Sequence, residues 1–176
     1  MDKTIAIFCA ASVKIDEKYN VAAREVVRAL HALGYTIVSG GGRVGTMGAI
    51  TDESVKVGGR HIAVIPKFMK GLENPDIKEF VWTDTMAIRK EKMREISCAA
   101  IALPGGIGTV DEFIETHTLK KLHKWNGELY ALNLNGFWNP LIDMLDHFVE
   151  TETLEPGDRD LVHFPSTVAE LIACFD

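Results

Sequence analysis

A glycine-rich turn followed by two acids is the part of the sequence best suited to chemistry. The segment LPGGIGTVDEF covers residues 103–113 and runs from an apolar strand end into the expected start of a helix. Glycines permit a sharp turn, and a helix N-terminus offers unpaired N–H donors, so this turn suits a phosphate. An acid beside a bound phosphate repels it, which favours a chemical role for Glu112. The alternative is that Asp111 and Glu112 only complement the helix dipole.

A second turn of the same kind, SGGGRVGTMG, covers residues 39–48. Its GGGRVG formally fits a dinucleotide pattern, but it follows the second expected strand, and the next strand, HIAVIP, ends without an acid to bind a ribose. The Lys of a nucleotide-hydrolysing loop is also missing, because Gly45 is followed by Thr46 and Met47. Two such turns in one small sheet predict an anion site. A mononucleotide, with its single phosphate, needs neither an acid at the end of the next strand nor the Lys of a nucleotide-hydrolysing loop.

A pair of cations falls on an apolar helical stripe in the segment TMAIRKEKMREIS, residues 85–97. Three residues mark the stripe: Met86, Met93 and Ile96. Arg89 and Lys90 share that face, where two cations are costly unless an anion meets them, so they are predicted to line the pocket. The alternative is that both side chains reach solvent at the edge of the stripe. The other charged residues are expected on a solvated face: Lys92, Arg94 and Glu95.

The elements that must position these residues alternate between strand and helix along the chain. Apolar runs predict strands over 4–8, 35–39, 61–65, 79–82, 99–103, 129–133 and 161–164. Helical patterns cover 17–33, 46–57, 85–97, 108–123, 140–150 and 166–174. Runs that are apolar throughout predict strands buried on both faces. We therefore predict an α/β fold, a Rossmann-like doubly wound parallel sheet with helices on both faces, in one nucleotide-binding domain over 1–176.

The composition excludes several classes of function. The chain has 176 residues and a formal net charge of −6 without a basic block, so binding to a nucleic-acid backbone is not expected. The apolar stretch near the N-terminus is too short for a signal core or a membrane span, and we expect no membrane association and a cytoplasmic location. Neither the three Cys nor the six His have ligand spacing, so we expect reduced thiols and no metal.

Three motifs together resemble those of a known family. SGGG..G.MG, RKEKM and PGGIGTVDE, in this order and spacing, are similar to those of the Lonely Guy (LOG) phosphoribohydrolases, which often carry the label of lysine decarboxylases. The resemblance runs over nearly the whole chain. It implies the doubly wound sheet, no cofactor, a homodimer or dimer of dimers with the site near the subunit interface, and hydrolysis of a nucleoside 5′-monophosphate, N6-modified AMP or AMP, to free base and ribose 5-phosphate.

The resemblance also implies roles for particular residues. Glu112 matches the essential glutamate and Arg89 the catalytic arginine, which orients the nucleotide and helps the purine leave. Glu112 would stabilise the positive charge that builds on the ribose and would orient or deprotonate the attacking water. The residues expected to bind substrate are Ser12, Gly41, Gly42, Glu79, Met86, Lys90, Gly105, Gly106, Gly108, Thr109 and Thr118.

The sequence departs from the family at several positions near these motifs. Ala87 follows Met86 where a His is usual, Thr46 replaces a Leu, and the segment THTLKKL at 116–122 lacks a common Trp. The preferred base is therefore left open. Two other functions also stay open: a non-catalytic carrier of a nucleotide or of molybdopterin, and a decarboxylase that uses pyridoxal phosphate, although no Lys has the setting of a Schiff base.

Overall fold

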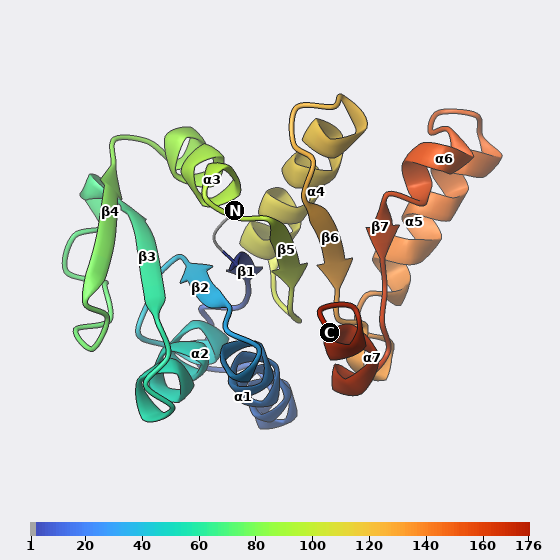
Figure 1. The fold of residues 1–176 in the computed structure, drawn as a ribbon. Helices are drawn as coiled ribbons and strands as arrows, with labels where there is room; N and C mark the ends of the chain where they lie inside the picture. Colours follow the sequence, from blue (N-terminus) through green and yellow to red (C-terminus); the bar gives the residue numbers. More distant parts are fainter. Residues whose placement is uncertain (1–2) are drawn as a thin grey trace.

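The computed structural model describes residues 3–176, and its strands form one sheet that is parallel throughout (Figure 1). The strands of this part of the chain are β1 (Thr4–Phe8), β2 (Thr36–Ser39), β3 (His61–Pro66), β4 (Glu79–Thr83), β5 (Ala99–Ala102), β6 (Glu128–Ala131) and β7 (Val162–His163). They are ordered β4-β3-β2-β1-β5-β6-β7. The predicted doubly wound sheet is confirmed.

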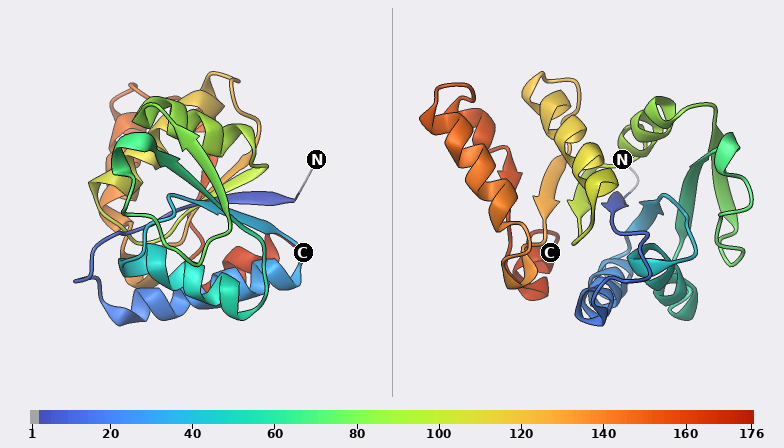
Figure 2. Two further views of the ribbon diagram at one scale, coloured as in Figure 1. Left: turned by 90° about the vertical axis from the view of Figure 1, so that its left-hand side faces the viewer. Right: turned by 180° about the vertical axis from the view of Figure 1, so that it is seen from behind.

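Helices cover both faces of the sheet (Figures 1 and 2). On one face lie α1 (Glu17–Ala32), α2 (Gly45–Lys56) and α7 (Val168–Ala173). On the other lie α3 (Met86–Glu95), α4 (Ile107–Lys121), α5 (Asn139–Glu150) and α6 (Pro156–Arg159). Short 3-10 turns cover Lys67–Met69 and Leu134–Gly136. The sequence patterns did not predict these two turns or α6, which are too short to show a hydrophobic period.

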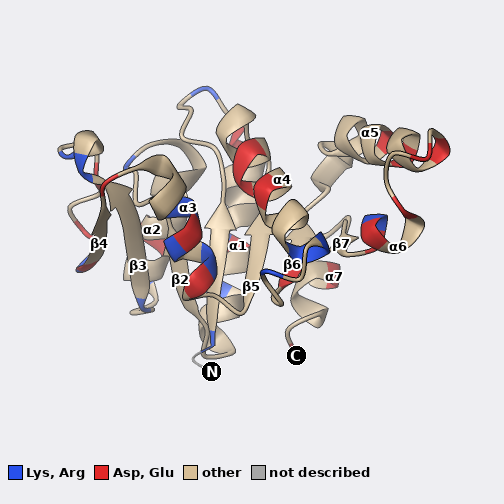
Figure 3. Ribbon diagram, turned by 90° about the horizontal axis from the view of Figure 1, so that it is seen from above, with Lys and Arg blue, Asp and Glu red and all other residues tan. Residues whose placement is uncertain are grey.

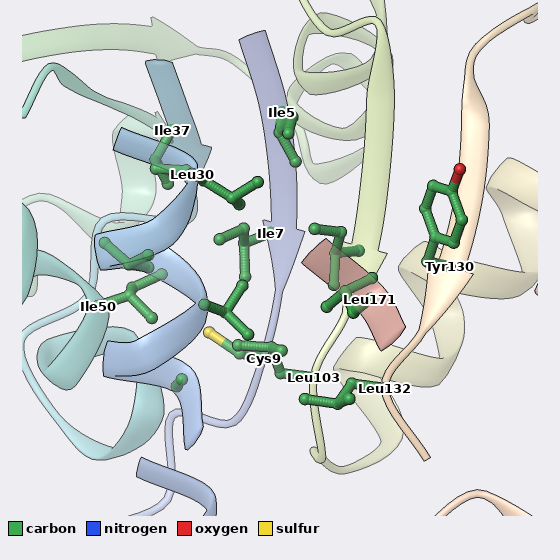
Figure 4. Packing of buried hydrophobic residues seen from close by; sticks show 14 of the residues in the cluster. Ile5, Ile7, Cys9, Leu30, Ile37, Ile50, Leu103, Tyr130, Leu132 and Leu171 are labelled. Carbon is green, nitrogen blue, oxygen red and sulfur yellow. The ribbon is translucent and has the colours of Figure 1, made fainter. Parts of the chain in front are cut away.

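Each strand supplies alternate residues to two apolar layers. Ile5 and Ile7 of β1 pack with α1, α2 and α7, whereas Ala6 and Phe8 pack with α3, α4 and α5. Figure 4 shows the first layer around Ile5, Ile7 and Leu103. Because side chains alternate across a strand, a strand between two helical layers must be apolar at every position. The edge strand β4 departs most from this rule, because its first four residues are at least partly exposed.

The strand order places a switch point between β1 and β5. From β1 the chain winds outward through β2, β3 and β4, and it then returns to place β5, β6 and β7 on the other side. Loops that leave the carboxyl ends of β1 and β5 therefore diverge to opposite faces, and ligands of such sheets bind in this crevice. Both glycine turns of the sequence leave strands at this carboxyl edge.

Candidate functional site

A buried ion pair joins α3 to α4 beside the glycine turns. Arg89 Nη1 donates to Glu112 Oε1 at 2.6 Å, and the two side chains are only 8% and 9% exposed. Arg89 Nε also donates to the carbonyl of Val64 in β3 at 3.0 Å. Thr85 caps α3 by accepting from the Ile88 N–H, which fixes the first turn of the helix that carries Arg89. The guanidinium is thus held from two sides.

Glu112 is a carboxyl group in a weakly solvated place. Burial raises its pKa above the ordinary value of 4.5, although the positive charge and hydrogen bond of Arg89 oppose the rise. Cys9, which follows β1, is buried nearby, and burial together with the charge of Glu112 raises the pKa of its thiol. A carboxyl group with a raised pKa next to a fixed cation is suited to accepting and releasing a proton.

The turn that precedes α4 leaves its main chain open. Gly106 is the N-cap residue and makes no side-chain cap, so the first N–H groups of α4 have no side-chain acceptor there. A Cβ atom added to Gly106 or Gly108 would meet nothing within 4 Å. Gly105 differs, because its Cβ would collide with the Thr109 hydroxyl and lie 3.1 Å from the Ala10 nitrogen. The open positions lie beside the helix N-terminus, where an anion is best stabilised.

The glycine turn after β2, residues 39–48, comes first along the chain and is called the first glycine turn from here on; it packs tightly on its surroundings. Gly41 has φ +68°, and its carbonyl accepts from the Asn74 N–H at 2.7 Å. The Gly42 N–H faces the sulfur of Met47 at 3.0 Å. Gly45 has φ +63°, and a Cβ there would lie 2.6 Å from the Ser12 carbonyl oxygen. These contacts bring the loop after β1, which contains Ser12, against this turn.

The loops that follow β1, β2 and β5 therefore meet at the switch point. The Met47 N–H donates to the Ala10 carbonyl at 3.1 Å, and Gly105 packs on the Ala10 nitrogen. Thr109 is buried at the start of α4, whereas Ser12 is exposed and its hydroxyl accepts from the Lys14 N–H. The structure thus assembles Arg89, Glu112 and both glycine turns into one region.

Lys90 takes a different position from the one predicted. Its ammonium bonds to Asp111 Oδ2 at 2.9 Å and also contacts Glu115, so acids of α4 already neutralise it. Arg94, expected on a solvated face, is buried and bonds to Glu115 at 2.6 Å. Figure 3 shows the basic positions of α3 beside the acidic positions of α4. The prediction for Arg94 was wrong because the acids lie on a helix distant in sequence.

Two further predicted residues, Met86 and Thr118, lie outside the buried core of this region. Met86 is 39% exposed at the first position of α3, so the apolar stripe does not extend to it. Thr118 is exposed well along α4, and its hydroxyl donates to the Ile114 carbonyl at 2.9 Å.

Glu79 is separated from the site by the length of the sheet. It is the first residue of β4, so it lies at the amino edge, where Arg60 binds its carboxylate through two hydrogen bonds of 2.8 Å. It lines a cavity of about 1000 Å³ there, together with Lys78, Ser97 and Trp125. Within one chain, therefore, Glu79 does not join Arg89 and Glu112, because it begins a parallel strand and they lie where the strands end. Its assignment to the substrate site stays a prediction.

Two parts of the site carried no usable sequence signal. The main-chain carbonyl of Val64 holds Arg89, but any residue type could supply it. Gly40 lies against the Arg89 guanidinium, and a Cβ there would collide with Nη2. The triple glycine was visible in the sequence, but its contact with a helix fifty residues later was not. Among the described residues, no group of three His, Cys, Asp or Glu side chains is arranged to hold a metal ion.

Comparisons with known proteins place the chain among characterised sequences. A family model described as "Possible lysine decarboxylase" matches residues 47–175. The Oryza sativa protein named "Probable cytokinin riboside 5'-monophosphate phosphoribohydrolase LOGL2" is 35% identical over 97% of this chain and 70% of its own length. The Mycobacterium tuberculosis protein named "Cytokinin riboside 5'-monophosphate phosphoribohydrolase" is 36% identical over 88% of this chain and 83% of its own.

Solved structures share the fold at lower identity. The molybdenum cofactor carrier protein of Chlamydomonas reinhardtii superposes with a TM-score of 0.75 at 19% identity, over 99% of this chain and 96% of that one. The molybdenum cofactor binding protein of Rippkaea orientalis gives a TM-score of 0.75 at 17% identity, over 99% and 95%. At these identities the likeness establishes the architecture and nothing about the ligand. No helix in residues 3–176 has the length and apolar character needed to cross a bilayer.

Proposed function

Because the chain belongs to the Lonely Guy family of phosphoribohydrolases, we propose that it hydrolyses the N-glycosidic bond of a nucleoside 5′-monophosphate. Water and the nucleotide are consumed, and the free base and ribose 5-phosphate are released. The expected substrate is N6-modified AMP or AMP itself, and the names of the relatives give a cytokinin riboside 5′-monophosphate for those proteins. The observation that carries the proposal is the buried Glu112–Arg89 pair beside the open turn at the N-terminus of α4.

In this proposal the 5′-phosphate is bound by the turn at residues 104–109. Gly106 and Gly108 leave room for phosphate oxygens to approach the main chain, and the N–H groups of α4 supply donors and partial positive charge. Thr109 adds a hydroxyl at the base of the turn. Lys90 contributes to the field from a distance, because Asp111 and Glu115 hold its ammonium.

Glu112 is the proposed group that acts on the sugar. Breaking the bond from C1′ to the base leaves positive charge on the ribose, which a nearby carboxylate stabilises. The same carboxylate accepts a proton from the water whose oxygen attacks C1′, while the departing base takes up a proton. Arg89 keeps the carboxylate in place and orients the nucleotide. The raised pKa of Glu112 brings its proton affinity closer to what a general base needs.

We also propose that the protein is a cytoplasmic homodimer or dimer of dimers. Apolar side chains beside the site support an interface there: Ile107 is 86% exposed, and Met86 and Ile88 of α3 are also exposed. Cys9, Cys98 and Cys174 are free thiols, in keeping with a reducing compartment. Light scattering on the purified protein would give the number of subunits, and substituting Ile107 with Asp would lower it if this surface is the interface.

A product assay tests the activity. The protein is incubated with a panel of nucleoside monophosphates, including AMP and N6-prenylated AMP, and the free base and ribose 5-phosphate are separated by chromatography. Equal amounts of the two products from at least one member are expected. Nucleotide binding without any base release would overturn the proposal in favour of a carrier.

A further inference from the structure

A buried hydrogen-bonded chain runs from β3 to the first glycine turn. Ser39, the last residue of β2, is fully buried, and its hydroxyl lies 2.7 Å from His61 Nε2. The Gly41 N–H donates to the same hydroxyl at 3.1 Å. Depending on which ring nitrogen carries the proton, the hydroxyl either donates to His61 Nε2 or accepts from it, and in both cases it accepts from the Gly41 N–H. When the hydroxyl donates, the imidazole must be neutral with its proton on Nδ1.

The surroundings of His61 favour that neutral form. His61 is buried at the start of β3, and burial lowers its pKa to about 4, with a smaller contribution from His31. Its Nδ1 has no hydrogen-bond partner among the described residues. A buried imidazole with one unpaired nitrogen is costly to keep. This cost is explained if Nε2, through the Ser39 hydroxyl, helps to hold the glycine turn in place.

The turn that this chain holds is in direct contact with Arg89. Gly41 follows Gly40, and Gly40 leaves no room for a Cβ because Arg89 Nη2 occupies that space. The position of the turn therefore limits where the guanidinium can lie. The same guanidinium donates to Glu112 at 2.6 Å. A shift of the turn is expected to reach the carboxylate through one shared side chain.

We propose that Ser39 and His61 are positioning residues, which hold the Gly40–Gly42 turn against Arg89 and thereby set the geometry of the Arg89–Glu112 pair. Neither residue contacts the reacting atoms. Their effect on catalysis rests on the proposed function, but their effect on Glu112 does not, because the ion pair exists without any substrate. This allows the two proposals to fail separately.

The experiment measures the Glu112 carboxyl by NMR. Protein labelled with ¹³C at the Glu side-chain carboxyl is titrated with acid, and the Glu112 signal is assigned by its loss in Glu112→Gln. Other charged or titratable groups that affect Glu112 are Arg89, Lys90, Asp111 and Cys9, and none of them is changed. In Ser39→Ala the pair loosens, the opposing effect of Arg89 weakens, and the pKa of Glu112 moves further upward.

Four further variants separate positioning from general damage. Ser39→Thr keeps the hydroxyl and is expected to restore the native pKa of Glu112. His61→Gln offers an acceptor near the Nε2 position and should stay close to native, whereas His61→Leu should behave like Ser39→Ala. Ser54→Ala removes another fully buried hydroxyl, which bonds to the Ile50 carbonyl on α2 and to His31 Nε2 but not to the glycine turn, and should leave Glu112 unchanged.

The same variants are assayed for base release from the best substrate of the panel. Ser39→Ala should lower kcat by about tenfold with a smaller change in KM, since a misplaced catalytic group affects the chemical step most. An unchanged pKa of Glu112 in Ser39→Ala would overturn the inference, whatever the activity. An inactive wild type whose Glu112 pKa still moves in Ser39→Ala would overturn the proposed reaction and support the positioning role.

Discussion

The two glycine turns have similar sequences but differ in what surrounds their glycines. In the turn after β2, added Cβ atoms would collide with Arg89 at Gly40 and with Ala63 at Gly41, and Gly41 and Gly45 have positive φ. In the turn after β5, Gly106 and Gly108 have room for a Cβ and lack positive φ. The first set of glycines is explained by packing within the chain, and these two of the second set are not.

We call residues 39–48 the support turn, because packing within the chain explains its glycines, and residues 104–109 the open turn, because Gly106 and Gly108 have free space beside them. A glycine that the chain itself requires tells little about ligands, because a turn or a close approach explains it. A glycine with free space and ordinary dihedral angles has no such explanation within the chain. The space beside Gly106 and Gly108 is where the proposed phosphate approaches the main chain. The first turn then acts indirectly, through Arg89 and Glu112.

The largest effect is expected at the acid that both turns serve. Glu112→Gln keeps the size of the side chain and an acceptor for Arg89 but removes the negative charge. We expect base release to fall by about 10³-fold, in the range of a lost general base, while AMP still binds. Steady-state kinetics and calorimetric titration measure the two quantities. Asp111→Asn, the same change one residue earlier on the exposed side, is the control, and equal losses in both variants would contradict the assignment.

The support turn can be broken by one methyl group. Gly41→Ala forces a side chain into the left-handed region and against Ala63, and the free energy of unfolding should fall by about 3 kcal/mol. Urea unfolding gives the value. Gly58→Ala provides the matched control, since Gly58 has φ +66° but open space around it, and about 1 kcal/mol is expected there. A similar loss in the two variants would mean that packing on β3 contributes nothing.

Protonation of His61 should contribute to the pH dependence of the free energy of unfolding. The pKa is 6.5 when unfolded and about 4 when folded, so this group supports folding fully above pH 6.5. That support is lost as the pH falls from 6.5 towards 4 and amounts to about 3 kcal/mol. His61→Gln has no such proton to bind. As the pH falls from 6.5 towards 4, the free energy of unfolding of His61→Gln should therefore rise relative to that of the wild type. Urea unfolding at several pH values measures this difference, and a constant difference would refute the prediction.

The sequence predicted the sheet because the strands and their ends depend on local patterns. Continuous apolar runs gave the strands, and glycines at strand ends identified the carboxyl edge. Helical spacing predicted that Arg89 lines an anion pocket, the family motifs joined it to Glu112, and the structure brings the two side chains into contact. The partners of Lys90 and Arg94 were not predictable, since α3 and α4 meet only through the fold. The assignment of Glu79 followed from the family motif alone, which does not say at which end of a strand the residue lies.

The open turn should respond in the opposite sense to the support turn. Gly108 lies in the first turn of α4 with free space for a Cβ, so Gly108→Ala should stabilise the fold by about 0.5 kcal/mol. The methyl group would stand where the phosphate approaches, and affinity for AMP should fall about tenfold, equivalent to about 1.4 kcal/mol. Thermal unfolding measures the expected gain in stability, and calorimetric titration measures the expected loss of affinity for AMP. Unchanged affinity would place the phosphate elsewhere.

The smallest effect is expected at Glu79, at the opposite edge of the sheet. Its carboxylate is bonded to Arg60 on the surface, and such exposed pairs contribute about 0.5 kcal/mol to stability. Glu79→Ala should therefore leave kcat/KM within about twofold of the wild type, equivalent to about 0.4 kcal/mol. Lys78→Ala, the neighbouring exposed change, is the control for surface charge. A tenfold loss of kcat/KM in Glu79→Ala alone would show that the amino edge of the sheet takes part in the reaction. The two glycine turns would then not account for the whole substrate site.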